Sequence, residues 1–149
     1  MIKVYLDNCT YNRPFDDQTQ IKIALETMAK QRIQRLIIEK AIVLVCSYVT
    51  RFENDKNPHP VSKKSISEFL KYASHYIDHS RWQSIETRAN GIRQSGVKTA
   101  DAFHISCAIE GTCDYFITTD KPLLNYRMSE IVICSPVQFF DYLEEQKDA

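Results

Sequence analysis

The sequence is poor in glycine and carries no excess of charge of either sign. Its 149 residues include only three glycines, none spaced as in a G-x-G-x-x-G or G-x-x-x-x-G-K motif, which excludes the dinucleotide and P-loop phosphate cradles. The 19 Lys and Arg residues balance 19 Asp and Glu residues, so the formal net charge is zero. At first sight, this balance argues against a nucleic-acid partner held by bulk electrostatics.

Long apolar runs and paired cysteines are also missing. No apolar stretch approaches the roughly 18 residues of a membrane-spanning helix, and the N-terminus lacks the apolar stretch of a signal peptide. The five cysteines are scattered and include no C-x-x-C pair, a pattern typical of reduced, buried thiols. We therefore expect a cytoplasmic protein with no membrane association.

Four short apolar segments predict a parallel sheet. They cover residues 2–6, 41–46, 115–118 and 131–134. The second contains six apolar residues without polar alternation, as in strands that are covered on both faces. Together with the length and the 44% apolar content, this pattern predicts one domain over residues 1–149. The expected fold class is α/β, a three-layer α/β/α sandwich with a mainly parallel central sheet.

Apolar residues at helical spacing predict helices between these strands. The expected helices cover residues 21–37, 47–54, 65–77, 82–96 and 100–110, and a last one begins after residue 135. Ser65 and Glu68 have the spacing of a capping box, and so do Ser135 and Gln138. Gly111 suits the end of the fifth helix. We expect the third and fourth helices to form an insertion that covers one edge or mouth of the sheet.

Carboxylates follow the predicted strands at one edge of the sheet. Asp7 and Asp120 come after the first and third strands, and ligands of open parallel sheets bind beyond the carboxyl ends of the strands. Asp101 lies in the first turn of the helix that leads into the third strand, and a right-handed crossover starts that helix at the same edge. Glu53 lies about two helical turns after the second strand. Each acid alone could be a turn or helix-start residue, but the shared edge favours a site.

Acids that converge without a matching cluster of bases repel one another and disfavour joint ionisation. A divalent cation removes this repulsion, and carboxylate oxygens suit Mg²⁺ or Mn²⁺. Such an ion lowers the pKa of a bound water and stabilises charge on the attacking and leaving oxygens of a phosphodiester. The acidic residues therefore predict metal-dependent phosphodiester chemistry at this edge.

Four sequence segments hold these acids in order and in register. They are residues 4–8, 47–53, 100–104 and 116–121. Together they resemble the PIN domains, and among them the VapC-like ribonucleases, over nearly the whole chain. The resemblance implies a metal-dependent endoribonuclease whose catalytic residues are Asp7, Glu53, Asp101 and Asp120. Asp7, Asp101 and Asp120 would bind Mg²⁺ or Mn²⁺ directly or through water, and Glu53 would orient a ligand water.

The same resemblance implies further residues and partners. Thr118 or Thr119 would support the acids through a hydroxyl, and both are candidate substrate-binding residues. Asn8, another candidate, stands where the family commonly has Thr or Ser. Members of the family are often toxins paired with an antitoxin, and they often dimerise. The expected partners are therefore RNA, an antitoxin protein and a second copy of the chain.

The loop after the first strand is a candidate substrate entrance. Asn12, Arg13 and Gln18 follow the first acid closely, and loops after strand ends usually carry binding groups. Basic residues concentrate in segments 30–40 and 81–98, whereas segment 141–149 is acidic. The basic segments are candidate phosphate contacts or solvated helix faces.

The sequence leaves other interpretations open. A domain of this fold could bind RNA or protein without cutting. A phosphatase of the haloacid dehalogenase type also begins with a strand that ends in Asp, but Cys9 stands where that chemistry needs a second Asp. His104 lies one turn after Asp101 and faces either the pocket or the core. With Cys107 and Cys113, it would make a zinc site of no standard spacing.

A pair of histidines has the spacing of metal ligands on a helix. His75 and His79 are four residues apart, on a segment expected to be an exposed helix. The pair lacks the Glu of an H-E-x-x-H motif, so an ordinary surface position is the favoured interpretation.

Overall fold

The computed structural model describes residues 1–147, so the last two residues of the acidic segment 141–149, Asp148 and Ala149, lie outside the described part of the chain. Within it, a five-stranded sheet has the order β3-β2-β1-β4-β5, and every pairing is parallel. The strands are β1 (Lys3–Leu6), β2 (Val43–Ser47), β3 (His75–Ile77), β4 (Tyr115–Ile117) and β5 (Val132–Cys134). Their carboxyl ends therefore all lie at one edge, and the predicted parallel sheet is confirmed.

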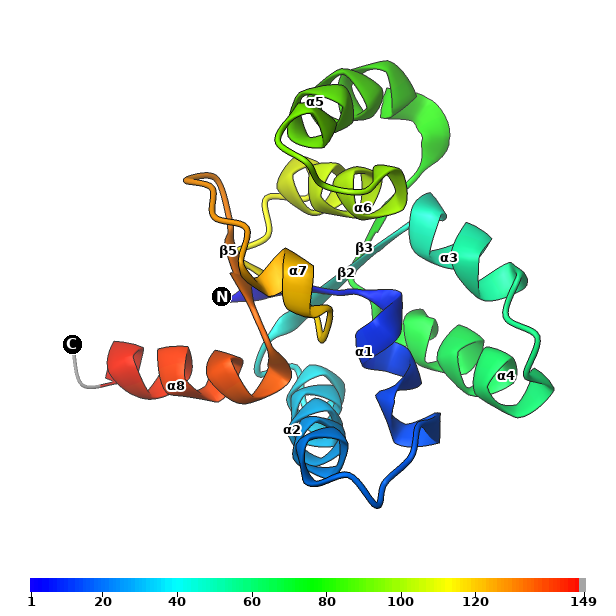
Figure 1. The fold of residues 1–149 in the computed structure, drawn as a ribbon, viewed down its shortest axis with the longest axis vertical. Coiled ribbons are helices and arrows are strands. Elements are labelled where there is room, and N and C mark those ends of the chain that lie inside the picture. The colour runs from blue at the N-terminus through cyan, green and yellow to red at the C-terminus, as the bar shows by residue number, and fades with distance from the viewer. Residues whose placement is uncertain (148–149) are drawn as a thin grey trace.

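Helices cover both faces of the sheet (Figure 1). α5 and α6 pack on one face, and α2, α4 and α8 pack on the other, which confirms the predicted three layers. The helices are α1 (Asn8–Asn12), α2 (Ile21–Ile38), α3 (Tyr48–Asp55), α4 (Pro60–Phe69), α5 (Trp82–Gln94), α6 (Thr99–Glu110), α7 (Lys121–Leu124) and α8 (Pro136–Lys147). Short 3₁₀ turns cover Arg13–Phe15, Leu70–Tyr72 and His79–Arg81.

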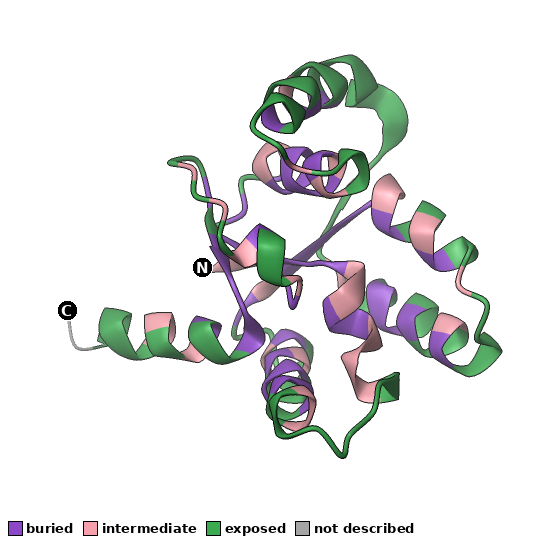
Figure 2. Cartoon of the chain, viewed as in Figure 1, coloured by how far each residue is buried: buried purple, intermediate pink, exposed green. Residues whose placement is uncertain are grey.

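Successive strand residues point into two separate cores. Val4 and Leu6 of β1 pack with Ile33 of α2 on one face, whereas Tyr5 packs with Ile105 of α6 on the other. This alternation is the period-two geometry of a strand. Because both faces are covered, β1, β2 and β4 are buried along most of their length (Figure 2), which explains their continuous apolar sequences.

The helix predicted over residues 65–77 is wrong at both ends. α4 begins earlier, at Pro60, because proline fits the first turn of a helix, where its missing N–H loses no hydrogen bond. Ser65 therefore lies inside the helix and does not cap it. Residues His75–Ile77 form β3, which pairs with the end of β2. Apolar spacing alone favours a helix here, but pairing with a distant strand overrides it.

The two helices expected as an insertion at one edge instead lie on opposite faces of the sheet. Ile66 of α4 belongs to the core under α2 and α8, and Ile85 of α5 belongs to the core under α6. β3 lies between them in the chain and forms an edge strand of the sheet. These helices are therefore part of the sandwich itself.

Local chemistry sets several helix ends. At the start of α8, Ser135 Oγ accepts a hydrogen bond from the backbone N–H of Gln138, whose side chain accepts one from the backbone N–H of Ser135, so the predicted capping box is confirmed. α6 ends before Gly111, as predicted. The short helices α1 and α7 were not expected, and each begins directly after a strand-end aspartate. No helix in the described residues is long and apolar enough to cross a membrane.

Candidate functional site

Asp7 is held firmly at the carboxyl end of the central strand, β1. Its carboxylate is nearly buried and caps α1, where Oδ1 accepts a hydrogen bond from the backbone N–H of Asn8 at 2.8 Å. Oδ2 accepts hydrogen bonds from Thr118 Oγ1 at 2.9 Å and from Cys9 Sγ at 3.3 Å. These three donors fix the orientation of the carboxylate at the edge of the sheet.

Thr118 and Thr119 lie behind Asp7 at the end of β4. Both are buried, and Thr118 Oγ1 also accepts a hydrogen bond from the backbone N–H of Asp120 at 3.1 Å. One hydroxyl thus links two of the acids. This geometry suits a supporting role for the threonines, and their contact with a substrate stays a prediction.

Asp101 and Asp120 reach the same edge from the first turn of α6 and from the residue before α7. Burial, followed by the charges of Asp7 and Asp120, raises the pKa of Asp101 to about 6. Glu53 adds to this effect. Because screening limits such repulsion to nearby charges, these effects indicate that Asp101 lies near the other three predicted acids.

Glu53 and His104 form a close pair at this site. His104 is completely buried, and its Nε2 lies 2.7 Å from Glu53 Oε1 and 4.0 Å from Asp7 Oδ1. Burial alone would lower the pKa of His104, but the hydrogen bond to Glu53 and the charges of Asp7, Glu53 and Asp101 raise it above its usual value. Burial likewise works to raise the pKa of Glu53, yet the bond from His104 lowers it. Both shifts favour the charged forms of the pair, an imidazolium and a carboxylate.

A chain of buried hydroxyls holds the other side of His104. Nδ1 lies 2.7 Å from the hydroxyl of Tyr5, which in turn lies 2.6 Å from Ser47 Oγ and 2.9 Å from Thr50 Oγ1. A protonated His104 donates from both ring nitrogens, so Tyr5 accepts from it and donates to Ser47 or Thr50. The sequence left open whether His104 faces the core or the pocket, and the structure buries it completely, with Glu53 as its partner at the acidic edge.

The residues predicted at the substrate entrance divide into two groups. Asn8 and Asn12 line a pocket next to Glu53, and Asn12 Nδ2 donates a hydrogen bond to the backbone carbonyl of Asn8. Arg13 turns away and pairs with the buried Glu26 at 3.0 Å and with an aspartate three residues on. Gln18 donates to the backbone carbonyl of Arg13. Arg13 and Gln18 therefore shape the loop, and their contact with substrate stays a prediction.

Two hollows flank the acidic edge. The first hollow has a volume of about 400 Å³ and is lined by residues that include Glu53 and Asn8. The second has a volume of about 290 Å³ and is lined by residues that include Asp101 and Asp120. The first is lined by Asn8, Asn12, Phe15, Asp16, Glu53, Asn54, Lys56, Asn57, Pro58, His59 and Ser62. The second is lined by Ser95, Gly96, Val97, Lys98, Asp101, Asp120, Pro122, Leu123, Asn125 and Tyr126.

Several basic side chains of the predicted phosphate-binding segments have other roles. Arg81 and Arg88 both pair with Glu110, and Lys30 is buried. Lys98 lines the second hollow beside two of the acids. The structure therefore narrows the candidate phosphate contacts of these segments to a few side chains, of which Lys98 is the best placed.

The alternative metal sites do not form. His75 lies in β3 and His79 in a 3₁₀ turn, so the expected helical pair does not exist. Within residues 1–147, no group of three or more His, Cys, Asp or Glu side chains is arranged to hold a metal ion. His104, Cys107 and Cys113 therefore do not form a zinc site. Burial raises the pKa of Cys107 to about 12, so this thiol stays protonated.

Comparison with solved structures identifies the fold. No protein-family model matches the chain, and no curated protein sequence is significantly similar to it. A chain in the crystal structure of VapBC2 from Rickettsia felis, bound to a DNA fragment from their promoter, gives a TM-score of 0.54 at 14% identity and covers 89% of this chain and 97% of that one. A chain of FitAcB from Neisseria gonorrhoeae gives a TM-score of 0.54 at 15% identity and covers 90% of this chain and 98% of that one. The fold is PIN-like.

A PIN-like fold implies a divalent metal, and the donor set here fits one. The edge offers several carboxylates, which are hard oxygen ligands, and burial together with the charges of Asp7 and Asp120 raises the pKa of Asp101. Asn8 Oδ1 is also buried without a hydrogen-bond partner in the described chain. Since no three of these side chains already enclose an ion, they would have to draw together around it.

Proposed function

We propose that this chain is an endoribonuclease that hydrolyses RNA phosphodiester bonds with Mg²⁺ or Mn²⁺. The observation that carries the proposal is that four acids share the carboxyl edge of a PIN-like sheet, where burial and the charges of the other acids raise the pKa of Asp101 to about 6. Repulsion of this kind is relieved when a divalent cation binds.

The four acids divide two roles in the proposed reaction. Asp7, Asp101 and Asp120 would hold the metal ion, directly or through water. A bound ion of this kind would activate a water and stabilise charge on the attacking and leaving oxygens. Thr118 and Cys9 keep the Asp7 carboxylate in place. Glu53, fixed by His104, would accept a hydrogen bond from the attacking water and so orient it.

The two hollows suggest how an RNA strand would cross the site. They open on either side of the acidic edge, and each contains a lysine, Lys56 in the first and Lys98 in the second. Phosphate contacts position a strand without reading its sequence. The scissile phosphate would then lie between the hollows, where the acids would hold the metal.

Cys9 argues against the phosphatase alternative. It stands two residues after Asp7, where the haloacid dehalogenase reaction needs an acid. Burial, followed by the charge of Asp7, raises the pKa of Cys9 to about 11. A neutral thiol donates to Asp7 but cannot act as the general acid and base of phosphate transfer near neutral pH.

The test compares three activities of the purified protein. We expect single-stranded RNA to be cut internally in Mg²⁺ or Mn²⁺ and to stay intact in EDTA, with no phosphate released from small phosphate esters. Release of phosphate from such esters would support a phosphatase, and RNA binding without cleavage would support a non-cutting domain. Asp101→Asn should abolish cleavage. Asp141→Asn, an exposed aspartate on α8, is the matched control and should cleave normally.

We further propose a biological setting. The similar structures are those of VapBC2, bound to a DNA fragment from their promoter, and of FitAcB, which supports an antitoxin partner for this chain. No disulfide joins cysteines within residues 1–147, which supports a reducing, cytoplasmic location. A small DNA-binding protein that copurifies with the chain and inhibits its ribonuclease activity would be the expected antitoxin.

A further inference from the structure

A group of aromatic rings lies on α3 and on the elements beside it. Tyr48 and Phe52 are four residues apart, so they occupy the same side of α3. The ring of Tyr48 contacts that of His79 edge-on, with 5.2 Å between the centroids, and His79 lies nearly parallel to Trp82 at 6.4 Å. Trp82 is the first residue of α5. We call this surface the aromatic strip, and its rings are those of Tyr48, Phe52, Tyr76, His79 and Trp82.

Two cations lie against rings of the aromatic strip. The guanidinium of Arg51, one turn after Tyr48 on α3, lies 4.3 Å from the centre of the Tyr76 ring in β3, which joins Tyr76 to the strip. The ammonium of Lys56, just after α3, lies 4.2 Å from the centre of the Phe52 ring. Among residues 1–147, neither cation forms an ion pair with a carboxylate. Both charges are therefore available to an anion.

The rings remain open to solvent with these cations in place. Phe52 is 58% exposed, Trp82 43% and Tyr76 42%. Grouped apolar side chains that no part of residues 1–147 covers are typical of a surface that binds a partner. Unpaired cations next to exposed rings favour an anionic partner that carries flat rings over an apolar protein surface. Single-stranded nucleic acids have both features, because their bases stack on aromatic side chains and their phosphates contact cations.

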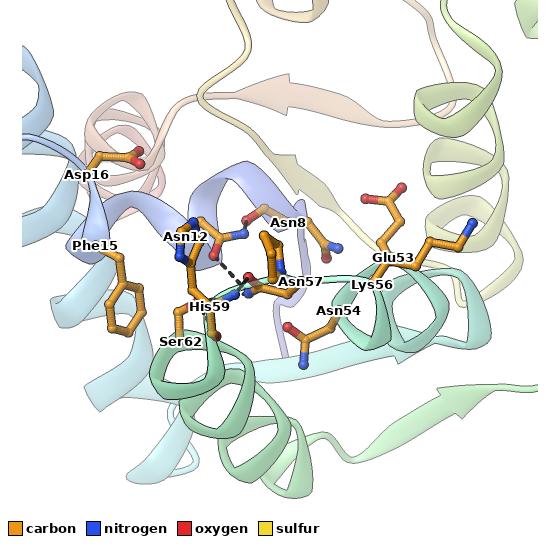
Figure 3. A pocket seen from close by; sticks show the side chains of 11 residues that line it. Asn8, Asn12, Phe15, Asp16, Glu53, Asn54, Lys56, Asn57, His59 and Ser62 are labelled. Atoms are coloured by element: carbon orange, nitrogen blue, oxygen red, sulfur yellow. Dashed lines mark hydrogen bonds between the residues drawn. The ribbon is translucent and has the colours of Figure 1, made fainter.

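The aromatic strip meets the proposed ribonuclease site at Lys56. This side chain lies over Phe52 and also lines the first hollow together with Glu53. Figure 3 shows Glu53 and Lys56 beside each other at the end of α3. The eight residues of α3 span about 12 Å, which is enough for a few nucleotides. A strand that leaves the metal site through the first hollow would therefore reach Phe52 first and continue along the strip.

We propose that the aromatic strip binds single-stranded RNA outside the acidic edge, with bases stacked on Phe52, Tyr76 and Trp82 and phosphates in contact with Arg51 and Lys56. This inference rests on the proposed ribonuclease function and names its substrate class, unpaired RNA. A duplex is a poor ligand for the strip, because its bases are already stacked on one another. Stacking accepts any base, so the strip adds affinity with little sequence preference.

The fluorescence of Trp82 tests the proposal directly, because it is the only tryptophan of the chain. An unpaired RNA of about ten nucleotides and a duplex of the same length are titrated into the protein in EDTA, so that no metal-dependent cleavage occurs. We expect the single strand to quench Trp82 and to bind about tenfold or more tightly than the duplex. Binding without quenching, or equal binding of the two RNAs, would overturn the proposal.

Tyr76 offers a variant with a matched control. We expect Tyr76→Ala to weaken binding of the single strand about tenfold and Tyr76→Phe, which keeps the ring, to restore it. The control is Tyr72→Ala, because Tyr72 is similarly exposed, at 52%, but precedes β3 and so lies at the end of that strand away from the acids. Unchanged binding in Tyr76→Ala, or equal losses in both alanine variants, would contradict stacking on the strip.

The salt dependence of binding tests the phosphate contacts. Each such contact to a single strand contributes about 0.7 to the slope of log affinity against log salt concentration. We expect Arg51→Gln to reduce the size of this slope by about 0.7. Lys71→Gln, at an exposed lysine before β3, should leave the slope as in wild type. An unaltered slope in Arg51→Gln would contradict its contact with phosphate.

Cleavage and mass measurements distinguish failure of this proposal from failure of the ribonuclease proposal. Metal-dependent cleavage that is as fast in Phe52→Ala and Tyr76→Ala as in wild type, at low RNA concentration, would overturn the strip and leave the nuclease. Binding through the strip without cleavage in Mg²⁺ or Mn²⁺ would overturn the nuclease and leave the strip. A fall to the mass of one chain in Phe52→Ala would show that the strip joins two copies of the chain, and would overturn its role in binding RNA.

Discussion

His104 is a buried histidine at the acidic edge, and its carboxylate neighbours favour its charged form. Its contact with Glu53 and its proximity to Asp7 join α3, α6 and β1, three elements that are far apart in the sequence. The sequence places Asp7, Asp101 and Asp120 at one edge, because each follows a strand or begins a helix, and the family resemblance adds Glu53. It left the orientation of His104 open, since that depends on how α3 packs against α6.

We expect His104→Gln to lower kcat by about tenfold to a hundredfold and to change KM little. Substitutions of residues that orient the ligands of a metal site commonly have effects of this size. The pH profile of kcat should also move, since Glu53 loses the bond that lowers its pKa. Tyr5→Phe, which keeps the stacked ring against Phe116, should show a weaker version of both effects. Unaltered kcat and pH profile in His104→Gln would contradict the role assigned to His104.

Asp101 should make the metal-free protein less stable above its own pKa. The folded pKa is about 6 and the ordinary value is 3.8, so the folded state binds the proton more tightly than the unfolded state. Its contribution to stability is therefore present below about pH 4 and is lost as pH rises to about 6. In EDTA at pH 7.5, we expect Asp101→Asn to be about 1 kcal/mol more stable than wild type, allowing for solvent screening. The difference should shrink toward pH 4 in thermal unfolding, and a constant or reversed difference would refute this explanation.

Secondary-structure elements differ in how far local sequence determines them. β1, β2 and α8 were predicted because apolar runs and a capping box are local signals. β3 was not, because its three residues are mostly exposed and form a strand only by pairing with β2. α1 and α7 are too short for periodicity to reveal.

Gly111, at the end of α6, is required by packing. Its φ of −78° suits any residue, but a Cβ there would lie 2.8 Å from Val45 Cγ1 of β2. We expect Gly111→Ala to destabilise the fold by about 1–3 kcal/mol in urea unfolding. Gly91→Ala in α5, where a Cβ meets nothing within 4 Å, should instead stabilise it by about 0.5–1 kcal/mol. Equal effects of the two substitutions would show that the close approach to Val45 is unimportant.

For the molecule as a whole, the balanced charge and one exposed surface have consequences for partners. The net charge of zero sums an acidic edge, basic helices and an acidic C-terminal segment, so it does not exclude an RNA partner. Ile21, Leu25 and Met28 lie along one side of α2 and are 51–78% exposed. Apolar side chains at helical spacing are typical of a contact with another protein.

We expect the proposed homodimer to use this side of α2, because a two-fold axis brings the same surface of both copies together. Light scattering should give twice the mass of the chain for wild type and the mass of one chain for the Leu25→Glu, Met28→Glu double variant. Val61→Glu, an equally exposed apolar position on α4, should remain dimeric. A monomeric wild type would rule out the homodimer, and a dimeric double variant would place the contact elsewhere.

The central proposal is that Asp7, Asp101 and Asp120 bind a metal ion and that Glu53 orients the water that attacks the RNA. The most direct measurement is the rate of cleavage of a single-stranded RNA as Mn²⁺ or Mg²⁺ is titrated into the metal-free protein. We predict a rate that rises from zero and saturates for wild type and for Asp141→Asn, and no cleavage at any metal concentration for Asp101→Asn. Cleavage that persists in EDTA, or that is unaffected by Asp101→Asn, would contradict the claim.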